Sequence, residues 1–161
     1  MPVGIRSETF VGGVLIRRML YDAADEPETL SPRQLRDAYE RELRAVIDVH
    51  GVETVAAEAD VETETIDALL DGGSVTLTLS EAAAILAVDD DAPDADAIVQ
   101  EIRDRLLMGM TTGVVDVDTI ASNVDLDLSG QEVQQAIEGR IPMTLDELAA
   151  IHGYIAGRNA R

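Results

Sequence analysis

The fold of this chain is decided by two short stretches, Ile66-Asp-Ala-Leu-Leu-Asp-Gly72 and Thr78-Leu-Ser-Glu-Ala-Ala-Ala-Ile85. Both return later in the same order, as Val133-Gln-Gln-Ala-Ile-Glu-Gly139 and Thr144-Leu-Asp-Glu-Leu-Ala-Ala-Ile151. Nearly the same number of residues separates the two stretches in each copy. Matching blocks in the same order and at similar spacing indicate an internal duplication of one structural unit.

The duplication divides the chain into an N-terminal segment, 1–30, and two units, 31–90 and 91–161. A unit of about 60 residues has only a marginal core of its own. We therefore expect the two units to pack against each other as one body. The segment 1–30 is expected to be flexible, or to lie partly upstream of a true start at Met19.

Helix signals recur at the same places in both units. Ser31-Pro32 supplies a capping serine and a first-turn proline, and Gly51 ends that helix. Capping boxes, in which Ser or Thr is followed three residues later by Glu, begin further helices at Thr78, Ser129 and Thr144. The expected helices are 31–51, 52–60, 63–71 and 78–88, then 94–108, 117–124, 129–139 and 144–157. The predicted fold class is all-α, with two tandem four-helix units of helix-turn-helix-like topology.

Two local features need separate mention. Gly109 and Gly113 are expected at the exit of the helix over 94–108, because glycine commonly ends a helix. The stretch 74–79 alternates apolar and polar residues, so a short strand is the alternative interpretation there.

Acidic residues dominate the charge of the chain. There are 32 Asp and Glu against 12 basic residues, all arginine, which gives a formal net charge of -20. Hydrophobic residues make up 46%, mostly aliphatic, which is enough for a core and argues against a disordered chain. The absence of cysteine excludes disulfides and Cys-type zinc sites. No apolar run approaches the ~20 residues that span a bilayer.

This lysine-free, Asp-rich and aromatic-poor composition resembles that of haloarchaeal cytoplasmic proteins, which implies a halophilic, cytoplasmic protein. Salt at 1 M screens charges within about 3 Å, so strong self-repulsion is tolerable there. The acids are spread along the chain and alternate with regularly spaced apolar residues. They therefore indicate a solvated acidic surface, and a nucleic-acid mimic is the alternative.

The first 18 residues differ from the rest. They contain one acid, Glu8, and three arginines, Arg6, Arg17 and Arg18. The apolar stretch 10–16 is short for a signal peptide, and no small-residue cleavage site follows it. Three interpretations stay open: a basic arm, a short strand, or translated sequence upstream of Met19. The last is favoured, because the change in composition coincides with that methionine.

The order of helices resembles the lambda-repressor/Cro-like helix-turn-helix. The residues that carry this resemblance are 55–72 with 78–88 in the first unit, and 120–126, 130–139 and 144–151 in the second. Small helical repeats converge on such patterns, so the motif is only moderately specific. The chain from Met19 onward is also similar to a haloarchaeal family of unknown function.

The resemblance implies that the second short helix of a unit enters the major groove of DNA. In the first unit this helix is acidic: it offers Glu62, Thr63, Glu64, Asp67 and Asp71, which would repel phosphate. In the second it offers Ser129, Gln131, Gln134 and Gln135, with Arg140 just past its end. Glutamine can make a bidentate contact with adenine. The expected function is that of a DNA-associated, transcription-regulator-like protein that reads with the second unit.

The alternative is a helical protein-interaction module that has lost DNA binding. Its partner would be another protein or a second copy of the chain, and no membrane is involved. A DNA reader needs a surface where arginines gather and acids are few, whereas an interaction module needs an exposed apolar patch.

No pattern in the sequence points to catalysis. The only histidines, His50 and His152, are far apart, so a metal site is not expected. The acidic stretches 89–91 and 123–127 lack the spacing of a calcium loop and are interpreted as turns. There is no phosphate-binding glycine loop and no nucleophile elbow. We therefore expect a non-enzymatic protein with no catalytic residues and no cofactor.

Overall fold

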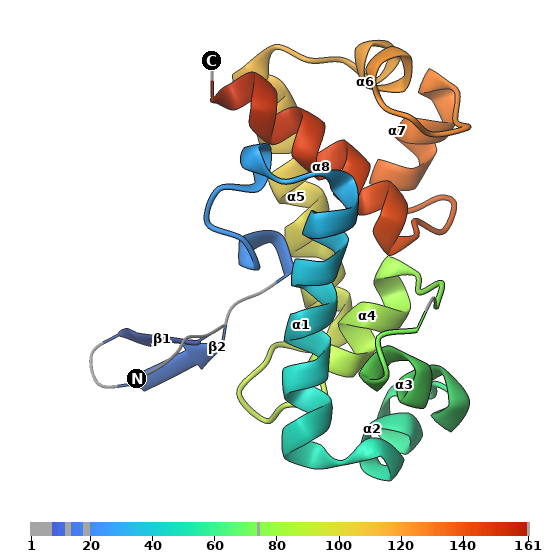
Figure 1. The fold of residues 1–161 in the computed structure, drawn as a ribbon. Coiled ribbons are helices and arrows are strands. Elements are labelled where there is room, and N and C mark those ends of the chain that lie inside the picture. Colours follow the sequence, from blue (N-terminus) through green and yellow to red (C-terminus); the bar gives the residue numbers. More distant parts are fainter. Residues whose placement is uncertain (1–7, 12–13, 18–19, 74, 161) are drawn as a thin grey trace.

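The computed structural model describes residues 8–11, 14–17, 20–73 and 75–160. Its body consists of eight α-helices packed together, which confirms the predicted all-α class. They are α1 (Pro32–His50), α2 (Val52–Ala59), α3 (Thr63–Leu70), α4 (Leu79–Leu86), α5 (Ala95–Gly113), α6 (Val117–Asn123), α7 (Gly130–Glu138) and α8 (Leu145–Asn159). Figure 1 shows α2 and α3 at one end of the body and α6 and α7 at the other.

Smaller elements precede the helical body. Strands β1 (Glu8–Val11) and β2 (Val14–Arg17) pair antiparallel, with Glu8 opposite Arg17. Figure 1 draws this hairpin away from the helices. Two short 3-10 helices follow, η1 (Leu20–Asp22) and η2 (Pro27–Thr29). η1 packs against α1 and α5, and η2 packs against α8, so residues 20–30 belong to the folded body.

The predicted caps are present. Thr78, Ser129 and Thr144 each accept a hydrogen bond from the backbone N–H three residues later, and the Glu there accepts one in return. Ser31 forms the same reciprocal pair with Gln34. Each box satisfies backbone donors that the first helical turn would otherwise leave unpaired.

The two halves of the chain interlock. The first helix of each half packs against the last helix of the other, α1 on α8 and α5 on α4. Where α4 and α8 begin, Thr78 and Thr144 form an isolated antiparallel bridge. The backbone N–H of Leu79 donates to the carbonyl of Met143 at 2.7 Å, and that of Leu145 donates to Leu77 at 2.9 Å. These reciprocal bonds relate the halves by an approximate two-fold axis.

The strand expected over 74–79 is confined to this bridge. Among the described residues of that stretch, Thr78 alone forms a β-bridge, and Leu79 already opens α4. Ser74 lies outside the described residues. The apolar alternation has a different cause, because Leu77 and Leu79 are both buried at the junction between the halves.

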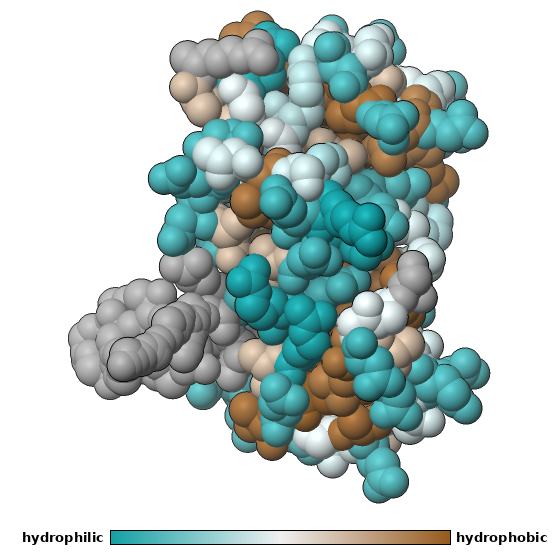
Figure 2. Space-filling view, viewed as in Figure 1, coloured by the Kyte–Doolittle hydropathy of each residue, from teal (hydrophilic) through white to brown (hydrophobic). Residues whose placement is uncertain are grey.

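The core is almost entirely aliphatic. One continuous cluster of buried side chains runs through both halves, so neither half has to be stable on its own. Tyr39 is the largest fully buried side chain, and Leu20 of η1 is also fully buried. Figure 2 shows one face of the body as mostly hydrophilic, interrupted by separate hydrophobic patches.

One helix end was predicted wrongly. The helix expected to end at Met108 continues through both glycines to Gly113. Gly109 and Gly113 lie one helical turn apart and face α8, where a Cβ at Gly109 would come within 2.6 Å of Ile155 Cγ2. At these positions glycine allows close helix packing, because it has no Cβ. The prediction that the two glycines end the helix was wrong.

Candidate functional site

The residues predicted to read DNA lie along the outer side of α7. Ser129 caps the helix, and Gln131 and Gln134 are exposed, whereas Gln135 is half-buried. Val133, Ala136 and Ile137 form the buried side, which faces the second half of the chain. The polar side of α7 is therefore not covered by the first half.

One carboxylate dominates the end of this helix. Glu138 accepts a hydrogen bond from Gln134 Nε2 at 3.1 Å and lies 3.4 Å from Arg140 Nε. Its backbone carbonyl accepts another from Arg103 of α5 at 3.0 Å. The side chain of Arg140 is 73% exposed. Arg140, the candidate phosphate contact, therefore already lies beside a carboxylate. This carboxylate weakens the attraction of Arg140 for a second anion.

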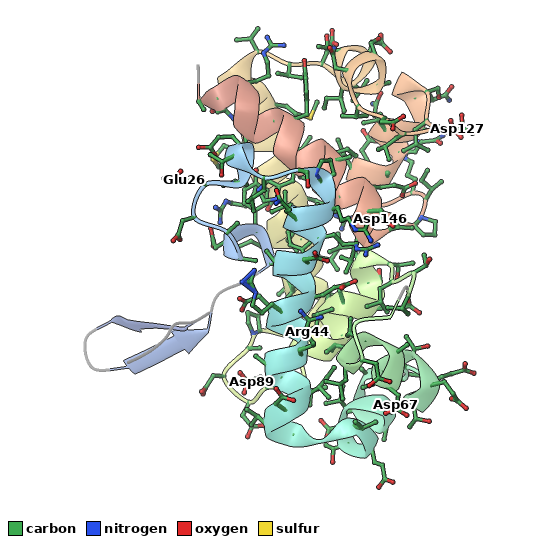
Figure 3. The ribbon with its side chains drawn as sticks, viewed as in Figure 1. Glu26, Arg44, Asp67, Asp89, Asp127 and Asp146 are labelled. Atoms are coloured by element: carbon green, nitrogen blue, oxygen red, sulfur yellow. The ribbon has the colours of Figure 1, made fainter. Side chains whose placement is uncertain are left out.

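The equivalent helix of the first half, α3, is strongly acidic on its exposed side. Glu62, Glu64, Asp67 and Asp71 are all exposed there, and Figure 3 shows Asp67 on this helix. Arg44 of α1 lies near its C-terminal end, with a guanidinium nitrogen 3.5 Å from the carbonyl of Leu69. In both halves, therefore, an arginine of the long first helix, α1 or α5, donates to a backbone carbonyl near the end of the short third helix, α3 or α7.

Carboxylates accompany arginines elsewhere on the body as well. Arg36 of α1 lies 3.5 Å from Glu40 and 2.9 Å from Asp146 of α8. Burial raises the pKa of Glu40, and the nearby Arg36 and Arg44 act in the opposite direction. Arg105 of α5 forms a 2.9 Å ion pair with Asp22 of η1. These pairs reduce the positive charge that Arg36 and Arg105 present to a polyanion.

The α5 apolar patch, which we define as Leu107, Met108 and Val114, is a surface that the sequence interpretation missed. Leu107 is 46% exposed, Met108 65% and Val114 84%. Among the described residues one further large hydrophobic side chain, Val49 at the end of α1, is comparably exposed. Three of the four therefore gather at the end of one helix.

The packing of α8 explains why large side chains point outward there. Asn159 Nδ2 donates to the carbonyl of Gly109 at 3.1 Å, and Arg158 lies along Gly113. Because glycines occupy the inner side of these turns, the large residues next to them in sequence fall on the outside. The sequence does contain two glycines one turn apart beside Leu107 and Met108, but it does not show that α8 packs on the glycine side.

Val114 also has an unusual backbone. It follows α5 with φ 54°, in the left-handed region, whereas the residue that follows the equally long α1 is Gly51, with φ 91°. A β-branched residue in this region is uncommon and strained. The second half thus places an exposed valine where the first half has glycine.

A buried aromatic cluster joins the N-terminal segment to the core. Tyr39 Oη lies 2.6 Å from His152 Nδ1, and the Tyr21 ring stacks on the imidazole with centroids 3.9 Å apart. Arg105 lies over the Tyr21 ring. Burial, with Arg105 nearby, lowers the pKa of His152 to about 4. A neutral imidazole that is 1% exposed has no access to a substrate, so the cluster is structural.

A family model described as a family of unknown function (DUF5791) matches residues 35–158. The chain belongs to this family. No curated protein and no solved structure matches it. The DUF5791 range contains α7, the α5 apolar patch and His152, and it begins after the hairpin and the two 3-10 helices.

Neither a metal site nor a membrane-spanning helix occurs among the described residues. The described residues contain no group of three or more side chains arranged to hold a metal ion. His50 instead lies 3.5 Å from Asp89, one of the expected acidic turn residues. None of the described helices is both long and apolar enough to cross a membrane.

Proposed function

We propose that this protein is a non-enzymatic helical module that docks a partner protein through the α5 apolar patch. One observation carries this proposal. In the last turns of α5 the glycines face the core and the large apolar side chains face outward, which is the reverse of the usual arrangement. Exposed apolar groups that gather in one place are typical of interaction surfaces. The strained and exposed Val114 supports the same surface, because backbone strain tends to be retained at functional positions.

The patch is suited to being covered. The Thr111 hydroxyl lies between Leu107 and Val114 along the helix and donates to the carbonyl of Leu107 at 3.1 Å. The hydroxyl proton therefore keeps its hydrogen bond when a partner covers Thr111. Asp104 and Asp116, which are exposed on either side in sequence, would form a polar rim around the apolar centre.

The test compares three forms of the full chain: wild type, Leu107→Gln with Met108→Gln, and the control Val49→Gln. Sedimentation in molar KCl reports self-association, and quantitative affinity capture from lysate reports other partners. The proposal expects a dimer or a captured protein that the double variant loses and the control retains. It is overturned if no association depends on Leu107 and Met108 more than on Val49.

DNA reading by α7 is the second candidate function. It is favoured by one observation, the outward position of Gln131 and Gln134 beside Arg140. We propose Gln131 and Gln134 as base contacts ahead of the half-buried Gln135, with Ser129 at the start of the helix. A mobility-shift series in KCl tests this. Arg140→Ala should weaken binding to all sequences alike, and Gln134→Ala should relax preference at one base pair. Absence of any shift at the lowest KCl concentration that keeps the protein helical removes this candidate.

A further inference from the structure

A groove lies at the junction of the two halves, separate from the α5 apolar patch. It has a volume of about 620 Å³ and is formed by the start of α4, the first half of α5 and the chain that leaves α7. Arg103, Arg140, Gln100 and Ser80 contribute polar groups, and Val99 and Ile141 contribute apolar surface. Pockets of this size, mostly apolar with a few converging polar groups, are typical of small-molecule sites.

The two arginines retain hydrogen-bonding capacity. A guanidinium has five N–H donors. Arg103 directs NH1 to the Glu138 carbonyl at 3.0 Å and NH2 to Gln100 Oε1 at 3.1 Å. Its Nε is buried and has no hydrogen-bond partner among the described residues. The second N–H of NH1 and the second N–H of NH2 are the donors that Arg103 can offer to an acceptor in the groove.

The start of α8 offers a comparison with the start of α4. Asp146, in the first turn of α8, accepts a 2.9 Å hydrogen bond from Arg36 of α1. The residue at the same place in the first turn of α4 is Ser80, in Thr78-Leu-Ser-Glu against Thr144-Leu-Asp-Glu. At the start of α8 a carboxylate of the chain meets Arg36, whereas at the start of α4 Ser80 lines a groove that Arg103 and Arg140 also line.

We propose that this groove binds a small organic oxyanion, a carboxylate or phosphate attached to an apolar body. The oxyanion accepts hydrogen bonds from Arg103 and Arg140, and the Ser80 hydroxyl lines the same groove. The apolar body lies against Val99 and Ile141.

Two acidic groups limit the affinity and help to define the ligand. Asp96 lines the same groove, and Glu138 lies beside Arg140. A ligand with a single anionic group can bind the arginines and keep its distance from Asp96. A polyanion would be repelled by both carboxylates and by the strongly negative remainder of the protein. The site therefore favours a small, singly substituted anion.

The experiment is an NMR titration of the full chain with hexanoate, hexyl phosphate and hexanol at fixed ionic strength in KCl. The reporters are the Nε–Hε signals of Arg103 and Arg140 and the side-chain amide of Gln100. We expect saturable shifts at these groups with one or both anions, and none with hexanol. Hexanoate and hexyl phosphate distinguish a carboxylate ligand from a phosphate ligand.

Matched variants make the assignment specific. Ser80→Asp places a fixed carboxylate in the groove and should abolish binding, whereas Ser122→Asp, on exposed α6, should not. Arg140→Gln should weaken binding about tenfold, as expected for one charged hydrogen-bonding partner. Arg41→Gln, at an exposed position of α1, should leave binding unchanged. Equal effects of Ser80→Asp and Ser122→Asp, equal shifts with hexanol, or the absence of saturable shifts would each overturn the proposal.

Discussion

At the scale of single residues, the surroundings of His152 strongly change its titration. Burial in the tyrosine cluster lowers its pKa to about 4, from an ordinary value of 6.5. Between these pH values the unfolded chain binds the proton and the folded protein does not. The free energy of unfolding should therefore fall as the pH is lowered from 6.5 to 4, by about 3 kcal/mol in total.

Denaturant unfolding at fixed KCl and several pH values measures this loss. His152→Gln should remove the extra pH dependence in that interval, because its side chain does not titrate. His50→Gln, at the partly exposed pair with Asp89, should retain it. If the wild type and His152→Gln lose stability in parallel from pH 6.5 to 4, His152 is not held neutral by the fold.

Val114 gives a second prediction at this scale. Glycine adopts its left-handed backbone without a Cβ clash, so Val114→Gly should raise the free energy of unfolding by about 1 kcal/mol. Val114→Ala removes most of the exposed apolar surface but keeps a Cβ, so it should give little of this gain. Thermal unfolding of the three forms decides the point, and a less stable glycine variant would contradict it.

At the scale of helices, local rules predicted most starts and stops. Ser31, Thr78, Ser129 and Thr144 cap helices as their sequence context indicated, because a capping box depends only on neighbouring residues. The end of α5 was not predictable in this way. Gly109 could either end α5 or let another helix pack closely against it. Which of the two occurs depends on α8, which is distant in sequence. The α5 apolar patch was missed for the same reason.

The close contact of α5 and α8 predicts opposite effects of one substitution at two glycines. Gly109→Ala would bring a Cβ to 2.6 Å from Ile155 Cγ2 and should destabilise the protein by about 1–3 kcal/mol. Gly157→Ala, in α8, meets nothing within 4 Å and should stabilise the helix by about 0.5–1 kcal/mol. Chemical unfolding measures both, and equal effects would mean that the helices are not in close contact at Gly109.

At the scale of the whole molecule, the N-terminal segment divides at about residue 19. Deleting residues 1–18 removes the hairpin and should leave the melting temperature within a few degrees. Deleting residues 1–30 also removes buried Leu20 and the Tyr21 ring on His152. That loss should cost about 3 kcal/mol, or on the order of 10 °C in melting temperature. Differential scanning calorimetry compares the two, and equal melting temperatures would show that η1 adds nothing.

The charge of the whole molecule predicts that folding depends on salt. The formal net charge is -20, and the core that opposes its repulsion is small and aliphatic. The screening length is about 10 Å at 0.1 M and about 3 Å at 1 M, so carboxylates on neighbouring helices repel one another in dilute buffer and hardly at all in molar KCl. Helicity should therefore decrease below a few hundred millimolar KCl.

Circular dichroism against KCl concentration measures this loss directly. A loss of helicity in dilute buffer could come from charge repulsion or from weaker hydrophobic burial. Sucrose separates these two causes, because it strengthens burial without screening charge. If repulsion is the cause, KCl should restore the helical signal far more effectively than sucrose does. A helical signal that stays unchanged in dilute buffer would mean that the interlocked halves hold together against their own charge. The Thr78–Thr144 junction and the continuous core would then outweigh the repulsion without help from salt.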